Sequence, residues 1–338
     1  MCPVTVPSMP FASRLRRTHL ARVRPRQVRR SPAVRAFGIV FARVRQSSRL
    51  PSVVPSEHRV PSEHRVPLSS SEAINSQKPP LWPVAIAFVV AVFVVLVLNV
   101  LLLMVFPRAM TEQGLSLQGI CASAAVTSVA LLTVAVAFAW ASRGNTLQAL
   151  GFERGVKMPL SATLIAAGTL TALSLSFAVT SELLGHADSG ALGAIQRSLL
   201  GAPSMAFGLS LLCLAALPAL AEELFFRGYV QARLRRRLGL VGAIGLSSAL
   251  FGLFHMDLRQ GLYAAAAGLL LGFLRERFGH LGVPMLAHGT NNLVGLVLTR
   301  FAVAPEARSA KVAMAVGLSV AGALGIWALL RLPRPRPQ

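Results

Sequence analysis

Two adjacent glutamates and an arginine interrupt a long apolar stretch of the chain. Glu222 and Glu223 are followed by Arg227 four residues after the second glutamate. An ionisable side chain at the centre of a membrane helix costs about 2.5–3.5 kcal/mol on insertion scales, so such groups indicate a functional site. Residues four apart share a helical face, which lets Glu223 pair with Arg227, whereas Glu222 lies about 100° away. The spacing predicts one glutamate for structure and one for chemistry.

Two later stretches carry groups that a reactive glutamate could use. His255 ends the run Phe251-Gly252-Leu253-Phe254, and His288 precedes Asn292 by four residues. The latter two therefore share one helical face. Each stretch alone is a weak signal, because a single membrane histidine can equally be a hydrogen-bonded core residue.

These residue types suit the hydrolysis of a peptide bond. A glutamate in a partly apolar pocket has its carboxylate destabilised, which makes Glu222 the predicted general base. His255 is predicted to hold the same water or to protonate the leaving nitrogen. His288 and Asn292 are predicted to donate to the oxyanion, a role worth about 2.7–4 kcal/mol per donor.

Taken in order, the three stretches resemble the motifs of a known family. Glu-Glu-x-x-x-Arg at 222–227, Phe-x-x-x-His at 251–255 and His-x-x-x-Asn at 288–292 are similar to the signature of the CPBP family. That family contains type II CAAX prenyl endopeptidases and bacteriocin-processing or self-immunity proteins of the ABI type. The resemblance covers about residues 203–300. It implies an intramembrane protease, similar roles at the matching positions, Glu223 with Arg227 as the pair that orients the site, and a peptide or lipid-modified protein as substrate.

The sequence leaves open whether zinc takes part. Glu222, His255 and His288 are possible ligands, and a zinc hydrolase normally uses three protein ligands and a water. The chain has no His-Glu-x-x-His motif, and the candidates come from three separate helices. The resembled family is usually described as metalloproteases, although direct activation of water by glutamate has also been proposed for it.

The composition is that of a polytopic membrane protein. The 338 residues are 54% hydrophobic and 14% charged, with a mean hydropathy of +0.61. This is too apolar for a soluble enzyme of the same length. The formal net charge of +22 comes from basic residues at the N-terminus and in short connections, which is a membrane topology signal. We therefore expect membrane lipids and no nucleic acid as partners. Cys2, Cys121 and Cys213 lack the spacing of a metal site and are predicted to be packing residues.

Residues 1–80 differ in kind from the rest. They alternate arginine with proline, serine and valine, and the hexapeptide at 54–59 recurs directly at 60–65. Such a segment buries too little apolar surface to offset the entropy of ordering, so it is predicted to be a disordered basic arm. Two interpretations remain open: an arm attracted to anionic lipid or nucleic acid, or a translation start further along.

The remainder is predicted to be an all-α bundle with about eight membrane spans, divided into N-terminal helices at 81–199 and a catalytic region at 200–338. The predicted spans are Leu81–Phe106, Leu117–Ala141, Pro159–Leu183, Met205–Phe226, Leu238–Met256, Leu258–Leu274, Leu281–Thr299 and Lys311–Leu330. Basic residues gather on one side, including Lys78, Arg143, Arg154, Lys157, Arg233, Arg235, Arg236, Arg237, Arg275, Arg277, Arg331, Arg334 and Arg336. Both termini are therefore predicted to be cytoplasmic in a bacterial-type membrane.

Two classes of function fit the sequence. The first is an intramembrane endopeptidase, and the second is a non-catalytic scaffold, self-immunity protein or proton-coupled transporter. The intact motifs favour the enzyme, since a scaffold has no need of these polar groups in lipid. Nearby residues are assigned to structure: Phe225, Phe226, Phe251 and Phe254 to packing, Gly268 and Gly272 to a helix contact, and Asp257 and Arg259 to an interfacial turn.

Overall fold

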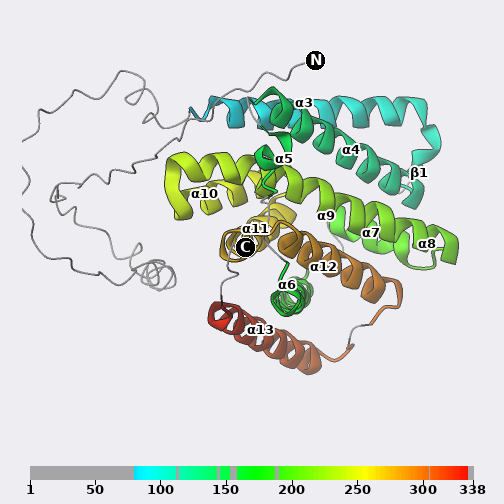
Figure 1. Cartoon of the computed structure of the whole chain (residues 1–338). Coiled ribbons are helices and arrows are strands. Elements are labelled where there is room, and N and C mark those ends of the chain that lie inside the picture. The colour runs from blue at the N-terminus through cyan, green and yellow to red at the C-terminus, as the bar shows by residue number, and fades with distance from the viewer. Residues whose placement is uncertain are drawn as a thin grey trace, which may run out of the picture. The chain divides into compact units, whose positions relative to one another are not determined.

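Helices make up nearly all of the chain that the computed structural model describes, namely residues 80–111, 114–142, 145–152, 158–186, 190–303 and 305–333 (Figure 1). The only strands in these ranges are β1 (Met110–Thr111) and β2 (Gly114–Leu115), which pair antiparallel. The predicted arm lies outside the described residues up to position 79, as do Lys78, Arg143, Arg154, Lys157, Arg334 and Arg336. The all-α class is confirmed.

Helices occur at all eight predicted positions. Seven of these positions are α3 (Trp82–Val105), α4 (Leu117–Ala141), α6 (Leu160–Leu183), α10 (Ala232–Phe254), α11 (Leu258–Phe278), α12 (Gly282–Arg300) and α13 (Arg308–Arg331). The other is a run of α8 (Ser204–Leu211), η3 (Leu212–Ala216), α9 (Leu217–Glu222) and η4 (Glu223–Gln231). Shorter helices are η2 (Pro107–Ala109), α5 (Thr146–Ala149) and α7 (Gly190–Leu199).

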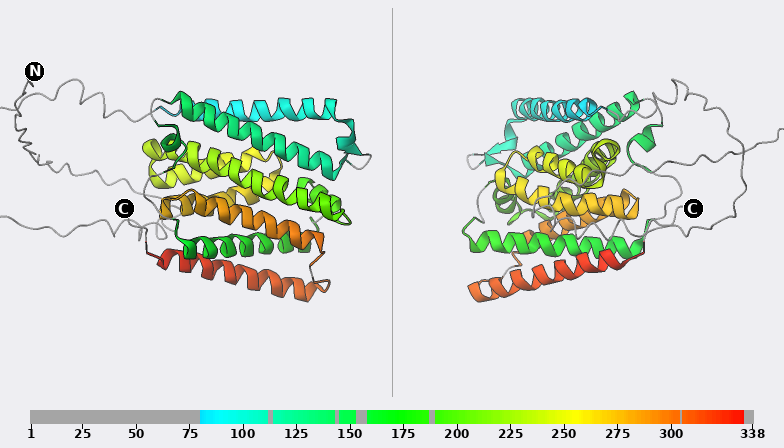
Figure 2. Two further views of the ribbon diagram at one scale, coloured as in Figure 1. Left: turned by 45° about the vertical axis from the view of Figure 1, so that its right-hand side comes forward. Right: turned by 90° about the vertical axis from the view of Figure 1, so that its left-hand side faces the viewer.

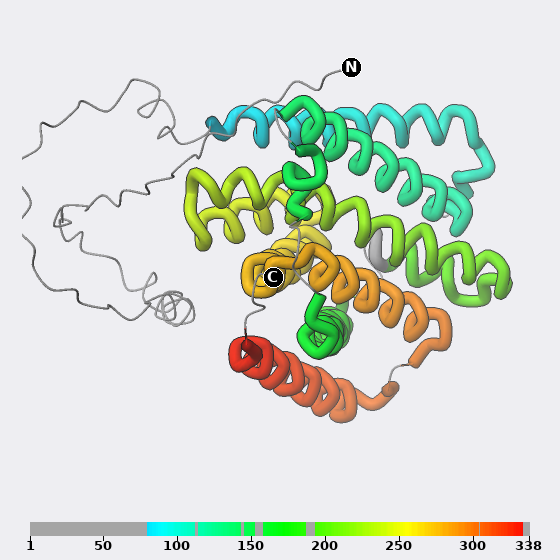
Figure 3. The backbone as a smooth tube through the Cα atoms, in the orientation of Figure 1, coloured from blue at the N-terminus to red at the C-terminus, as the bar shows by residue number. Residues whose placement is uncertain are grey.

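The helices lie roughly side by side in a bundle. Helices α3 and α4 form one end of it, and α6 and α13 form the other, with α9, η4 and α12 between them (Figures 1 and 2). The trace in Figure 3 shows the same order of neighbours. The segment that carries Glu222 and Glu223 therefore lies inside the bundle, which is where buried polar groups can find partners.

Two parts of the central run are π-helical. Segment η3 ends two residues before Pro218, whose ring has no N–H and clashes with the carbonyl four residues earlier, so a wider turn accommodates it. Segment η4 begins at Glu223, inside the first predicted motif. Wide π-helical turns are rare and often lie at functional sites.

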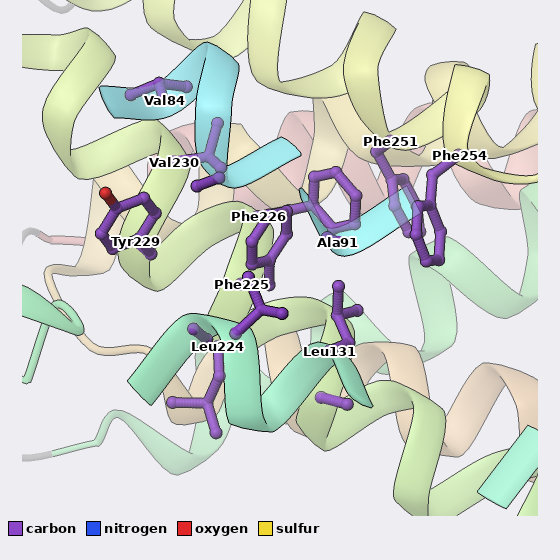
Figure 4. Close-up of a cluster of buried hydrophobic side chains, with 14 of the residues drawn as sticks. Val84, Ala91, Leu131, Leu224, Phe225, Phe226, Tyr229, Val230, Phe251 and Phe254 are labelled. Carbon is purple, nitrogen blue, oxygen red and sulfur yellow. The ribbon is translucent and has the colours of Figure 1, made fainter. Parts of the chain in front are cut away.

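An aromatic core surrounds η4. Phe225, Phe226 and Tyr229 are fully buried against Val84 and Ala91 of α3, Leu131 of α4, and Phe251 and Phe254 of α10 (Figure 4). The ring of Phe226 lies edge-on to both α10 rings, at 5.1 Å from Phe251 and 5.6 Å from Phe254 between centroids. The prediction that the four phenylalanines pack rather than line a groove is confirmed. This core fixes the depth and rotation of η4.

The chain reverses direction at Gly239. This residue has φ 74° and ψ −172°, which a residue with a Cβ rarely adopts. Beyond it, the Ser247 hydroxyl donates to the Phe226 carbonyl at 3.0 Å, so α10 folds back along η4. The helix that contains the fourth predicted span, which was expected to end at about Phe226, runs on beyond that residue. The helix continues because Tyr229 and Val230 are still buried in the core, and the basic residues 233–237 follow before the reversal.

Five helical segments among the described residues are long and apolar enough to cross a membrane: Trp82–Val105, Leu117–Ala141, Leu160–Leu183, Ser204–Phe254 and Arg308–Arg331. The fourth has 51 residues, about 77 Å at 1.5 Å per residue, and contains the reversal at Gly239. Helices α11 and α12 are long enough, but their polar residues lower their hydropathy. The chain is an integral membrane protein with several spans.

Candidate active site

A buried ion pair anchors the site. Nη1 of Arg227 donates to Oε1 of Glu223 at 2.8 Å, and the two side chains are 1% and 0% exposed. The guanidinium also lies over the ring of Phe251, with Cζ 4.3 Å from the centroid. Breaking a buried ion pair by removing one partner typically costs about 3–5 kcal/mol. The predicted pairing of Glu223 with Arg227 is therefore present within η4, and the contact of the guanidinium with Phe251 joins η4 to α10.

His288 connects α12 to both glutamates. Its Nδ1 donates to Oε1 of Glu223 at 3.0 Å, and its Nε2 lies 3.7 Å from Oε2 of Glu222. The expectation that Glu222 points away from the pair is corrected, because both carboxylates reach the same imidazole. The two ring nitrogens of His288 each face one carboxylate, so a single imidazole serves both side chains although they diverge along the helix.

Accessibility separates the two glutamates. The Glu222 side chain is 13% exposed and that of His288 is 10% exposed, whereas Glu223 is fully buried. A group that activates water must reach it, so Glu222 is the carboxylate of this pair that is placed for that task. Glu223 already accepts from Arg227 and from His288, which suits an orienting role.

The charges of the cluster are not balanced when the imidazole is neutral. Two carboxylates and one guanidinium sum to one negative charge, and the Arg227 charge is directly matched by Glu223. Within the described part of the chain, the ion-pair contact of Glu222 is with His288. One additional proton on Glu222 or on Nε2 of His288 makes the cluster neutral. In that form the imidazole lies between the two carboxylates and, together with Arg227, balances their charge.

His255 lies at the end of α10, across Phe251 from the cluster. Its Nδ1 donates to the Phe251 carbonyl at 2.9 Å, which fixes the tautomer and leaves Nε2 as an acceptor. The Phe251 ring is edge-on to His255 at 5.0 Å and to His288 at 5.9 Å between centroids. The two histidines thus flank one phenylalanine, rather than touching each other.

A tight turn holds His255 in this place. Helices α10 and α11 approach so closely that a Cβ on Gly252 would lie 2.5 Å from the Gly261 carbonyl oxygen. Met256, the next residue, has φ 51°, a left-handed conformation that costs energy for a residue with a side chain. Asp257 then caps α11 by accepting from the Gln260 amide at 2.7 Å, as expected of a turn residue.

Asn292 belongs to a polar group behind the cluster. Its Oδ1 accepts from Nδ2 of Asn291 at 3.2 Å, and the same nitrogen donates to the Tyr263 hydroxyl at 3.2 Å. Tyr263 in turn contacts Ser174 of α6 at 2.5 Å. The sequence interpretation missed Tyr263, Asn291 and Ser174. A tyrosine next to a run of alanines in an apolar helix was an available signal, since a buried hydroxyl needs a partner.

Helix α11 passes close to Arg227 because its residue at that point, Gly268, has no side chain. A Cβ on Gly268 would lie 3.2 Å from Nη2 of Arg227 and 3.0 Å from Cβ of Ser248. One turn further on, a Cβ on Gly272 would lie 2.8 Å from Oε1 of Gln231. These glycines were predicted to form a helix contact, and that prediction is confirmed.

The three residues considered as zinc ligands do not form a compact set. Among the described residues, no group of three or more His, Cys, Asp or Glu side chains is arranged to hold a metal ion. Both ring nitrogens of His288 face carboxylates, and Nδ1 of His255 is bonded to a carbonyl. The donor set in this arrangement does not fit a three-ligand zinc centre.

Comparison with known proteins points to one family. Residues 204–294 match the family model described as type II CAAX prenyl endopeptidase Rce1-like. This range runs from the start of α8 into α12 and includes all six predicted site residues. No curated protein and no solved structure matches the chain.

Proposed function

We propose that this chain, which over residues 204–294 belongs to the type II CAAX prenyl endopeptidase Rce1-like family, is an intramembrane endopeptidase with Glu222 as its general base. One observation carries the proposal. The partly exposed carboxylate of Glu222 faces Nε2 of His288 at 3.7 Å, beside a fully buried Glu223–Arg227 pair. Such a division between a reactive and an orienting carboxylate suits acid–base chemistry and has no use in a purely structural bundle.

Hydrolysis would begin with a water held between Glu222 and the histidines. Glu222 takes one proton as the water oxygen attacks the scissile carbonyl carbon. Nε2 of His255, an acceptor in the tautomer set by Phe251, orients the same water. As the tetrahedral intermediate collapses and the C–N bond breaks, the proton that Glu222 took from the water passes through Nε2 of His255 to the leaving nitrogen, which returns Glu222 and His255 to their starting states.

Donors from α12 would stabilise the oxyanion that forms during the attack. Nδ1 of His288 is bonded to Glu223, so Nε2 is the nitrogen that can reach the reacting groups, and it is a donor in the imidazolium form that makes the cluster neutral. Asn292 lies one turn further along the same face and supplies an amide N–H. Removing one oxyanion donor typically costs about 10²–10³ in kcat.

The substrate class follows from the family and from the location of the site. The family is named for prenyl endopeptidases that act on CAAX sequences, so a peptide with a lipid-modified cysteine is the proposed substrate. Lipid surrounds the bundle, and exposed apolar residues cover α3, including Val89, Phe93 and Met104. No nucleic-acid partner is proposed.

We further propose eight spans with both termini in the cytoplasm. The helices at the eight predicted positions support this count, with Gly239 dividing the 51-residue segment into two antiparallel helices. The basic residues of the connections support the orientation. Arg300, Arg308 and Lys311 oppose it, since they would lie outside; Lys311 is paired with Glu182.

The decisive experiment replaces the base. Glu222→Gln keeps the size of the side chain and removes the proton acceptor, so turnover should fall by about 10²-fold or more. The assay is cleavage of fluorescence-quenched peptides, with and without an S-farnesyl cysteine, by protein purified in detergent. Glu182→Gln is the matched control, because this carboxylate pairs with Lys311 of α13 away from the site. The melting temperature of Glu222→Gln should stay near that of the wild type.

The opposite result identifies the alternative. If Glu222→Gln and His288→Ala both keep the wild-type biological phenotype, the protein acts as a non-catalytic scaffold or self-immunity protein.

Zinc stays a prediction of the family resemblance. If a metal takes part, a chelator abolishes cleavage and added zinc restores it. Direct activation of water by Glu222 predicts the same turnover with and without the chelator. Unfolding measured in parallel separates a loss of metal from a loss of structure.

A further inference from the structure

A chain of four polar side chains runs from α6 to the catalytic face of α12. Ser174 of α6 contacts the Tyr263 hydroxyl of α11 at 2.5 Å. Nδ2 of Asn291 donates to that hydroxyl and to Oδ1 of Asn292, both at 3.2 Å. The four groups come from three helices and end at a residue of the third motif. None of the first three belongs to the motifs.

The direction of every hydrogen bond in this chain is determined by its first member. The Ser174 hydroxyl donates its one proton to the Leu170 carbonyl at 2.7 Å, and a carbonyl can only accept. Ser174 must therefore accept from Tyr263. With its own proton given to Ser174, the Tyr263 hydroxyl can only accept from Asn291.

This order fixes the amide of Asn291. Its nitrogen has two protons, one for Tyr263 and one for Oδ1 of Asn292. Asn292 consequently presents its oxygen to Asn291, and its own Nδ2 is left to point elsewhere. We propose that Tyr263 is a positioning residue that sets the amide orientation of Asn292 and so keeps its N–H groups available to the oxyanion. This inference rests on the proposed endopeptidase function.

The surroundings support a fixed position for the tyrosine. Its ring stacks on Phe177 of α6, with centroids 5.2 Å apart and an angle of 30° between the planes. Asn291 is buried. A partly buried polar chain in which each shared proton is assigned is rigid, because reversing one amide would leave a donor facing a donor.

Removing the hydroxyl tests the inference directly. In Tyr263→Phe, Asn291 loses its acceptor and its amide is free to turn over, which would draw Nδ2 of Asn292 toward Oδ1 of Asn291. We expect kcat to fall by about 10-fold or more, up to the 10²–10³ that complete loss of an oxyanion donor costs, while KM stays near the wild-type value. The substrate is the peptide that the wild type cleaves best in the farnesylated and unmodified set.

A double-mutant cycle distinguishes positioning from packing. If Tyr263 acts through Asn292, the double variant Tyr263→Phe/Asn292→Ala should be no slower than Asn292→Ala alone. If the hydroxyl merely stabilises the fold, the two losses should multiply. Ser174→Ala should show a smaller loss of the same kind, because Tyr263 is then free to donate to Asn291.

Ser176→Ala is the matched control. It removes a serine hydroxyl from the same helix, but this hydroxyl donates to the Ala315 carbonyl and contacts Ser319 of α13. Its turnover should equal that of the wild type. Multiplying losses in the cycle, or an unchanged kcat in Tyr263→Phe, would overturn the inference alone. A wild type that cleaves no peptide, or Glu222→Gln at full turnover, would overturn the proposed function together with it.

Discussion

Glu222 and Glu223 are adjacent in the sequence, but their side chains have different environments. Glu223 is enclosed by Arg227 and His288, whereas Glu222 is partly exposed and reaches only the far nitrogen of the same imidazole. A fully buried carboxylate cannot be reached by a water, whereas a partly exposed one can. The environment, not the residue type, assigns the roles.

Glu223→Gln should therefore lose stability as well as turnover, whereas Glu222→Gln should lose turnover alone. The change at Glu223 leaves Arg227 as an unpaired buried charge, which should cost about 3–5 kcal/mol of stability as well as turnover. Thermal unfolding in detergent measures the loss. The double variant Glu223→Gln/Arg227→Met should recover stability without recovering turnover, and a stable single variant would argue that the pair contributes little to the fold.

The sequence predicted the Glu223–Arg227 pair because four-residue spacing on a helix is sufficient to place it. It did not predict that Glu222 also reaches His288, because that contact depends on how α12 packs against α9. Asn292 was recognised by spacing, but its partner Asn291 and the hydroxyl of Tyr263 were not. Those contacts join three helices and follow from packing alone.

At the scale of elements, α11 supports the site from behind without contributing a charged group to it. Its glycines allow it to pass close to η4 and α10, where Gly268 lies against Arg227 and Ser248. Close approach through small residues is a common way for membrane helices to pack. The position of Arg227, and through it Glu223, depends on the absence of a side chain there.

Gly268→Ala should consequently disturb the site by displacing Arg227 and the adjacent part of α10. The added Cβ would lie 3.0 Å from Cβ of Ser248, so α10 or α11 must shift, at a cost of about 1–3 kcal/mol. Turnover should fall with stability. Gly245→Ala is the control, because a Cβ there has no heavy atom within 4 Å, and it should be neutral or slightly stabilising. Equal behaviour of the two variants in thermal unfolding and turnover would contradict this account.

At the scale of the whole molecule, composition and hydropathy were sufficient to predict a helical membrane bundle and the position of each long helix. The residues at which the helices end were less predictable. The helix that carries Glu222 extends past Phe226 because Tyr229 and Val230 remain in the core, and the hydrophobic pattern does not show this. The basic residues Arg233, Arg235, Arg236 and Arg237 were assigned to a short connection between spans, but they lie in the first part of α10, before the bend at Gly239.

The proposed orientation can be tested with reporter fusions. Fusions after Phe106 and Leu183 should report the outside, and fusions after Ala141 and Arg237 should report the cytoplasm, since the basic connections stay inside. Alkaline phosphatase and a fluorescent protein give complementary signals at each site. The reverse pattern would invert the molecule, and a mixed pattern would reduce the number of spans.

The backbone of Gly239 has a consequence for the parity of the membrane crossings. Its left-handed conformation turns one continuous helical stretch into a descending and an ascending arm, so Phe226 and Ser247 meet across the turn. Without that turn the two arms would form a single rod, and in the proposed topology the chain would arrive at α11 from the opposite leaflet. Under that topology, the two torsion angles of one glycine determine from which side the chain after residue 239 enters the bilayer, and whether His255 and His288 approach Glu222 at the same depth.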